Sequence, residues 1–132
     1  MDNCIFPCVF TYESDGIHIY FPDFDGCVSF GENEKDAYHS ANEALSLHIF
    51  GMEQDGESMP EPSVMMDLPL EKNQRAALIE VNMPLFRAQQ ENKYVRKTLT
   101  IPEWLNIIAE KSDVNFSQLL QKALKQHLNI VR

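Results

Sequence analysis

The stretch YVRKTLTIPEWL, residues 94–105, decides the expected fold of the C-terminal part of the chain. Between residues 95 and 101 polar and apolar side chains largely alternate, with the two-residue period of a β-strand. Pro102 is favoured in the first turn of a helix, so the strand is predicted to end there and a helix to begin. The outward polar residues are Arg96, Thr98 and Thr100, and the inward apolar residues are Val95, Leu99 and Ile101.

Two helices are predicted after this strand, in PEWLNIIAEKS (102–112) and FSQLLQKALKQHLNIVR (116–132). Asn115 is a good N-cap for the second helix, and Gln118, three residues on, completes a capping-box pattern. A strand and two helices in about 40 residues bury too little apolar surface to be stable alone. The sequence therefore predicts that this part dimerises.

The sign of the net charge changes along the chain. Residues 1–93 carry 5 Lys and Arg against 17 Asp and Glu, a net charge of −12. Residues 94–132 carry 6 against 3, a net charge of +3. Many of these charges are expected to be solvated surface groups. The change of sign nevertheless predicts two partners of opposite charge, a basic one for the front and an acidic one for the back.

The front of the chain is predicted to form a small antiparallel sheet. CIFPCVFTYESDGIHIYFPDF (4–24) indicates a hairpin with its tight turn at Asp15-Gly16, and residues 27–30 indicate a third strand. Pro7 predicts that the first strand is an edge strand or contains a bulge. A fourth strand is predicted over residues 76–82, and residues 64–70 are also expected to be extended.

One long helix is predicted between the third and fourth strands. Asn33 is its expected N-cap, and Asp55-Gly56 is expected to close it. Residues 83–93 indicate a short helix or linker, with Pro84 in the first turn. The fold class is therefore α+β, a small antiparallel sheet with a packed helix. The apolar face of the long helix is Ala37, Ala41, Ala44, Leu45, His48 and Met52.

The bulk composition, 44% hydrophobic and 23% charged, is typical of a soluble globular protein. No apolar run approaches the roughly 18 residues that span a bilayer, and the N-terminus lacks the basic region of a signal peptide, so a cytoplasmic protein without membrane contact is expected. Cys4, Cys8 and Cys27 match no zinc-site spacing. Cys4 and Cys8 with His18 are conceivable metal ligands, but buried reduced thiols are the favoured interpretation.

Two parts of the sequence resemble one family. FPDFDGCVSFGENEKDAYHSANEAL (21–45), followed by QDGESMPEPS (54–63), resembles the N-terminal domain of HicB antitoxins. KTLTIPEWL (97–105) and VNFSQLLQKAL (114–124) resemble a ribbon-helix-helix DNA-binding domain, which some HicB proteins carry at the C-terminus. The domain boundaries expected from this resemblance are a toxin-neutralising domain at 1–82, a linker or short helix at 83–93, and a dimeric DNA-binding domain at 94–132.

The resemblance implies an antitoxin of a HicA–HicB type toxin–antitoxin system. Its front domain, similar to a reduced RNase H-like fold, would bind a small basic RNA-cleaving HicA-like toxin. The back domain would pair with a second copy into a homodimer or higher oligomer and repress its own operon by binding operator DNA. The alternative is a stand-alone ribbon-helix-helix repressor whose front domain senses a ligand.

The ribbon of such a dimer enters the major groove of DNA, so its outward side chains are expected to read bases. Arg96 can donate two hydrogen bonds to guanine, and Thr98 and Thr100 can contact either base. Lys97 departs from the aliphatic residue usual at its position, and its stem is expected to pack while its ammonium reaches a phosphate. Free backbone N–H groups at the start of the last helix are expected to anchor a phosphate, at Asn115, Phe116 and Ser117.

The acidic front suggests both a toxin-binding surface and a nuclease site. Its candidate toxin-binding residues are Asp23, Asp25, Glu32, Glu34 and Glu43. Asp23, Asp25 and Glu43 are also conceivable Mg²⁺ ligands of a nuclease. Because two of these share one turn and no nucleophile or phosphate-loop motif is present, turn-forming or toxin-facing roles are favoured. No catalytic residue, metal or cofactor is expected.

Overall fold

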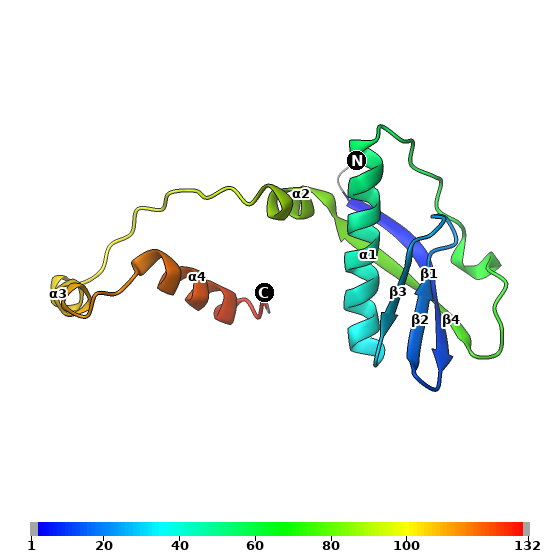
Figure 1. Cartoon of the computed structure of the whole chain (residues 1–132), viewed down its shortest axis with the longest axis horizontal. Helices are drawn as coiled ribbons and strands as arrows, with labels where there is room; N and C mark the ends of the chain where they lie inside the picture. Colours follow the sequence, from blue (N-terminus) through cyan, green and yellow to red (C-terminus); the bar gives the residue numbers. More distant parts are fainter. Residues whose placement is uncertain (1–2, 131–132) are drawn as a thin grey trace. The chain divides into compact units, whose positions relative to one another are not determined.

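The computed structural model describes residues 3–130, and the chain divides into two compact units, the first ending at Lys93 and the second beginning at Tyr94. Each unit is described by itself. The first unit holds a four-stranded antiparallel sheet and a long helix (Figure 1). The predicted α+β class, with a small antiparallel sheet and a packed helix, is confirmed.

The strands lie in the order β3-β2-β1-β4, and all neighbours are antiparallel. The predicted hairpin is β1 (Asn3–Glu13) with β2 (Gly16–Tyr20), and the predicted third strand is β3 (Val28–Gly31). The tight turn lies at residues 14 and 15, one position before the expected pair, because Gly16 already pairs with Glu13. Gly16 has a φ of 142°, and a Cβ there would lie 2.5 Å from the ring of Phe30.

The prediction that β1 is an edge strand is wrong, because β1 lies between β2 and β4. Pro7 is nevertheless compatible with this position. The pairing with β2 begins only at Val9, whereas the pairing with β4 (Gln74–Asn82) extends along the whole of residues 3–11. Pro7 therefore has one neighbouring strand, and its missing N–H group removes no bond from the β2 ladder.

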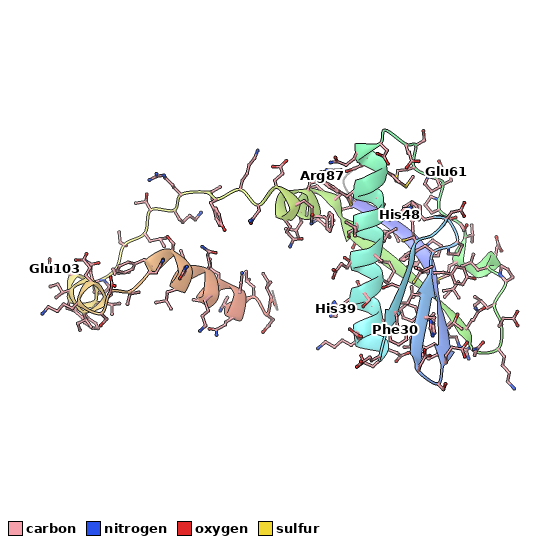
Figure 2. The ribbon with its side chains drawn as sticks, in the orientation of Figure 1. Phe30, His39, His48, Glu61, Arg87 and Glu103 are labelled. Atoms are coloured by element: carbon pink, nitrogen blue, oxygen red, sulfur yellow. The ribbon has the colours of Figure 1, made fainter. Side chains whose placement is uncertain are left out.

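The long helix α1 (Glu34–Gln54) packs against one face of the sheet. Its caps are as predicted: the Asn33 side chain accepts a hydrogen bond from the Asp36 N–H, and Gly56 follows the C-cap with a φ of 69°. His48 is half-buried, and its ring lies edge-on to that of Phe24 at a centroid distance of 5.4 Å (Figure 2). The buried residues of this helix are Ala37, Ala41, Leu45, Ser46 and Ile49.

The start of α1 lies so close to β3 that Gly31 leaves no room for a side chain. A Cβ on Gly31 would collide with the backbone and side chain of Ala37. The small residues at both positions therefore permit the close contact between strand and helix. Gly51, on the exposed side of α1, has nothing near the position of a Cβ.

These two glycines give a matched pair of substitutions. Gly31→Ala is expected to lower the free energy of unfolding of the first unit by about 2 kcal/mol, because overpacking forces the backbone to shift. Gly51→Ala is expected to raise it by about 0.5–1 kcal/mol, because glycine is unfavourable inside a helix. Thermal unfolding followed by circular dichroism measures both. A Gly31→Ala variant as stable as the parent would contradict the described contact.

The connection from α1 to β4 differs in part from the prediction. Residues 64–70 were expected to be extended, but the short 3₁₀ helix η1 (Met65–Asp67) lies there. The predicted fourth strand is confirmed as β4, which begins two residues earlier than expected. This connection is fastened to the turn after β2, because the Asp23 carboxylate accepts hydrogen bonds from the backbone N–H of Ser63, at 2.9 Å, and from its hydroxyl.

Helix α2 (Met83–Glu91) ends the first unit and packs on it. Met83 and Phe86 are buried, and the Phe86 ring lies 5.7 Å from that of Phe50. Arg87 binds Glu53 near the end of α1 through two hydrogen bonds, at 3.0 and 2.6 Å (Figure 2). These bonds lower the pKa of the Glu53 carboxyl, so the pair stabilises the packed α2 at neutral pH and loses that contribution as the carboxyl protonates in acid.

The second unit contains α3 (Glu103–Lys111) and α4 (Phe116–His127). Both helices were predicted, although Pro102 is the N-cap of α3 and not its first residue. The Asn115 side chain caps α4 by accepting a hydrogen bond from the Gln118 N–H at 3.1 Å, as expected. Over residues 3–130, every helix is too short or too polar to cross a membrane.

Candidate functional site

In the second unit, every residue predicted to contact DNA is exposed to solvent. Residues 93–102 form neither helix nor strand in the single chain, and Arg96, Lys97, Thr98 and Thr100 are exposed. A ribbon between two copies takes its hydrogen bonds from the second copy, so strand pairing here stays a prediction. Figure 1 draws this segment as an extended trace, and its residues are accessible, which is the condition that a ribbon requires.

The start of α4 offers free backbone donors. Asn115 is the N-cap, and its side chain takes the N–H of Gln118, so the N–H groups of Phe116 and Ser117 stay available at the helix end. All three residues named for the phosphate anchor are exposed. The helix dipole favours an anion at this end.

The apolar side chains of the second unit are also exposed, which is unusual for a folded domain. No described residue of this unit is buried, and only Asn106, Ala109, Val114 and Leu120 are half-buried. Trp104 is 63% exposed and Leu119 is 56% exposed. Helices with apolar faces require a surface to cover them. The apolar faces of α3 and α4 are therefore not covered within this unit.

The acidic residues predicted for the first unit do not form one cluster. Asp23 and Asp25 lie in the connection between β2 and β3, whereas Glu32 and Glu34 follow β3. Since β2 and β3 pair antiparallel along their whole lengths, these connections lie at opposite ends of the strands (Figure 1). Glu43 is exposed on α1. The chain itself uses both carboxylate oxygens of Asp23 in the bonds to Ser63.

The hairpin end of the sheet carries more acidic residues than the sequence analysis identified. A shallow hollow there is lined by Glu32 and Glu34 together with Glu13 and Asp15. The pairing of Ile17 with Gly31 brings the β1–β2 turn beside the residues that follow β3. We call Glu13, Asp15, Glu32 and Glu34 the acidic rim. The signal for the two missed residues was their place at the predicted turn: Asp15 forms part of it, and Glu13 lies two residues before.

One carboxylate of the acidic rim is fixed by the chain. The Tyr12 hydroxyl donates to the Glu34 carboxylate at 2.5 Å. This hydrogen bond, together with partial burial, raises the pKa of Tyr12, so the tyrosine stays a neutral donor. The side chain of Asp36 is used at the same end of α1, where it accepts from the N–H of Glu32 at 2.9 Å. Hydrogen bonds therefore hold the side chains of Glu34 and Asp36 in place at the start of α1.

The predicted interpretation of the cysteines as buried thiols is confirmed. Cys4, Cys8 and Cys27 are free and buried, and burial raises the pKa of Cys8 to about 12 and that of Cys27 to about 11. His18 lies exposed and outside this core. Within residues 3–130, no three His, Cys, Asp or Glu side chains are placed to share a metal ion. Asp23, Asp25 and Glu43 accordingly form no metal site among these residues.

Comparison with known proteins identifies the family. Residues 6–124 match the family model described as HicB_like antitoxin of bacterial toxin-antitoxin system. This match covers most of the sequence, and the chain belongs to the family of HicB-like antitoxins. The chain also resembles an uncharacterized 14.9 kDa protein of Haemophilus phage HP1, with 26% identity over 96% of this chain and 72% of the relative.

Solved structures of toxin–antitoxin complexes contain similar chains. A chain in a toxin–antitoxin complex from Streptococcus pneumoniae has a TM-score of 0.61 and 23% identity, covering 95% of this chain and 99% of that one. A chain in the HicA3 and HicB3 toxin–antitoxin complex has a TM-score of 0.52 and 28% identity, covering 60% of this chain and 99% of that one. The match to the Streptococcus pneumoniae chain supports the fold described above.

Proposed function

We propose that this antitoxin binds and inhibits a small basic HicA-like toxin through its first unit, and represses its own operon as a dimer of its second unit. The observation that carries the proposal is the division of charge and exposure between the units. The first unit has a buried core and a charge of −12, whereas the second is net positive and has its apolar side chains exposed. Each unit therefore requires a different kind of partner.

The toxin-binding half of the proposal rests on charge and on the family. An acidic surface attracts a basic partner and raises the association rate, with an effect that weakens as salt rises. The proposed residues are the acidic rim with Asp25 and Glu43, while Asp23 serves mainly to hold the connection at Ser63. A chain 28% identical to this one occurs in a complex of HicA3 and HicB3, which supports a HicA-like toxin as the partner.

The DNA-binding half rests on the extended segment. In the proposed dimer, residues 95–101 of two copies pair as a ribbon in the major groove, with Arg96, Thr98 and Thr100 toward the bases. Leu99 and Ile101, both exposed in the single chain, pack between the ribbon and the helices. The N–H groups of Phe116 and Ser117 hold a backbone phosphate and fix the register of the ribbon.

Arg96→Ala tests the DNA-binding half. We expect the full-length variant to bind DNA from upstream of its own gene at least tenfold more weakly, because a bidentate arginine–guanine contact contributes about 1–3 kcal/mol of discrimination. Lys125→Ala removes the same charge from the far end of α4 and is expected to change affinity less than twofold. Gel shifts at one fixed low salt concentration measure both.

An additional variant separates charge from geometry. Arg96→Lys keeps the positive charge but cannot form two parallel hydrogen bonds, so it should lose preference for the operator over random DNA while retaining non-specific affinity. Unchanged operator affinity in Arg96→Ala would overturn the role of this residue in base recognition.

A further inference from the structure

The face of the sheet opposite α1 carries exposed apolar residues on β2 and β3. On β3, Ser29 turns toward α1 and its hydroxyl donates to the Ser40 carbonyl at 3.3 Å. Its neighbours Val28 and Phe30 therefore point to the other face, as alternation along a strand requires. Val28 is 65% exposed and Phe30 is 40% exposed.

The register of the sheet adds two residues of β2 to this face. Tyr20 pairs with Val28, and His18 pairs with Phe30. Tyr20 is exposed like its neighbours. We call Tyr20, Val28 and Phe30 the β2–β3 patch. On the same face, Pro7 and Val9 of β1 are fully buried, whereas Ile5 of β1 and Leu78 of β4 are also exposed, at 50% and 52%.

The aromatic part of the β2–β3 patch is held in place by its neighbours. The Phe30 ring (Figure 2) lies edge-on to the His18 ring, at a centroid distance of 5.2 Å. His18 Nε2 lies 3.0 Å from the Asp15 carboxylate. Gly16 lies beneath the Phe30 ring, since a Cβ there would come within 2.5 Å of it. An ordered aromatic side chain loses little entropy when a partner covers it.

The acidic rim borders the β2–β3 patch. Glu32 follows the patch strand directly, and Asp15 is joined to it through His18. Apolar anchors surrounded by polar or charged groups are the usual arrangement of a protein–protein interface. The charge also selects the kind of partner. A second copy of the first unit would bring another −12 charge to this surface, whereas a basic protein is attracted to it.

We propose that the β2–β3 patch is the apolar centre of the toxin-binding surface, with the acidic rim at its hairpin end contacting basic side chains of the toxin. This inference rests on the proposed toxin-binding function and specifies its location. The contact energy that holds the complex together then comes from Tyr20, Val28 and Phe30. The attraction that speeds its formation comes from Glu13, Asp15 and Glu32.

Val28→Arg in the full-length chain tests this location. The probe is a purified small basic HicA-like toxin from the same source, and its affinity is measured by calorimetry. We expect about hundredfold weaker binding, because the substitution removes an apolar contact and places a positive charge against a basic partner. Leu47→Arg is the matched control, since Leu47 is 59% exposed on α1, and its affinity should stay within about threefold.

Glu32→Gln provides a second readout that does not disturb the patch. It should slow association severalfold at low salt and lose this effect at high salt, while dissociation changes little. Thermal unfolding of each variant shows that the first unit stays folded.

The outcomes separate this inference from the proposed function. If the parent binds and Val28→Arg binds equally well, the patch is not the toxin site, although the toxin-binding function stands. If Val28→Arg and Leu47→Arg lose affinity equally, the effect comes from total charge and the specific patch is again overturned. If the parent chain does not bind the probe at all, the proposed function fails and this inference fails with it.

Discussion

Leu124→Glu is expected to dissociate the proposed dimer of the full-length chain into monomers. Leu124 is 50% exposed in the single chain and lies on the apolar face of α4 with Phe116, Leu120 and Leu128. In a symmetric dimer the substitution occurs twice, and each copy loses an apolar contact and gains a desolvated charge. At about 2 kcal/mol per copy, the dissociation constant should rise roughly thousandfold.

Two measurements check this expectation. Light scattering gives the mass, and the fluorescence of Trp104, the sole tryptophan of the chain, reports whether the second unit is covered. Gln126→Glu is the matched control, because it introduces the same charge two residues on, on the opposite side of α4. A Leu124→Glu variant with the same mass and the same emission wavelength as the parent at low concentration would contradict dimerisation through this face.

Leu45→Ala is expected to lower the free energy of unfolding of the first unit by about 3 kcal/mol. Leu45 is fully buried on α1 between this helix and the sheet, and removing three carbon atoms there leaves a cavity. Leu47→Ala, two residues along the same helix, removes the same atoms from an exposed position and should change stability by less than about 0.5 kcal/mol.

Hydrogen exchange is the suitable measurement for this pair, because Trp104 lies in the second unit and its fluorescence does not report on the first. Amides of β1 and α1 should exchange roughly a hundredfold faster in Leu45→Ala, while those of Leu47→Ala match the parent. Equal protection in the two variants would show that α1 does not pack on the sheet through Leu45.

Local signals in the sequence were sufficient for most elements of both units. Asn33 and Asn115 cap their helices through hydrogen bonds to residues three positions on, so nearby residues alone determine them. The hairpin is similarly local, and its turn was misplaced by one residue because the pairing of Glu13 with Gly16 depends on register. Short-range patterns therefore locate elements well and their exact ends less well.

Features that depend on distant parts of the chain were not predictable. Pro7 indicated an edge strand, and nothing local shows that β4, some 70 residues later, pairs along that side. The bonds between Asp23 and Ser63 join residues 40 positions apart, so the structural use of Asp23 was not visible. The β2–β3 patch was missed for the same reason, because an alternating strand gives no indication of whether its outer face is covered.

The separation of the candidate acidic residues into two groups was also not predictable, because it depends on strand pairing. Asp23, Asp25, Glu32 and Glu34 are near one another in sequence, and proximity suggested one acidic surface. The antiparallel pairing of β2 with β3 sends the two pairs to opposite ends of the strands, and brings Glu13 and Asp15 to the second pair instead. In the second unit the candidate residues lie in two short segments, within 96–100 and 115–117, so the exposure within each segment could be expected.

The most direct test of the account is an RNA-cleavage assay of the proposed small basic HicA-like toxin, titrated with the full-length antitoxin. The account predicts that cleavage falls to background at about one antitoxin chain per toxin, and that activity returns when Val28→Arg replaces the parent at the same concentration. Full cleavage in the presence of saturating parent antitoxin would contradict it.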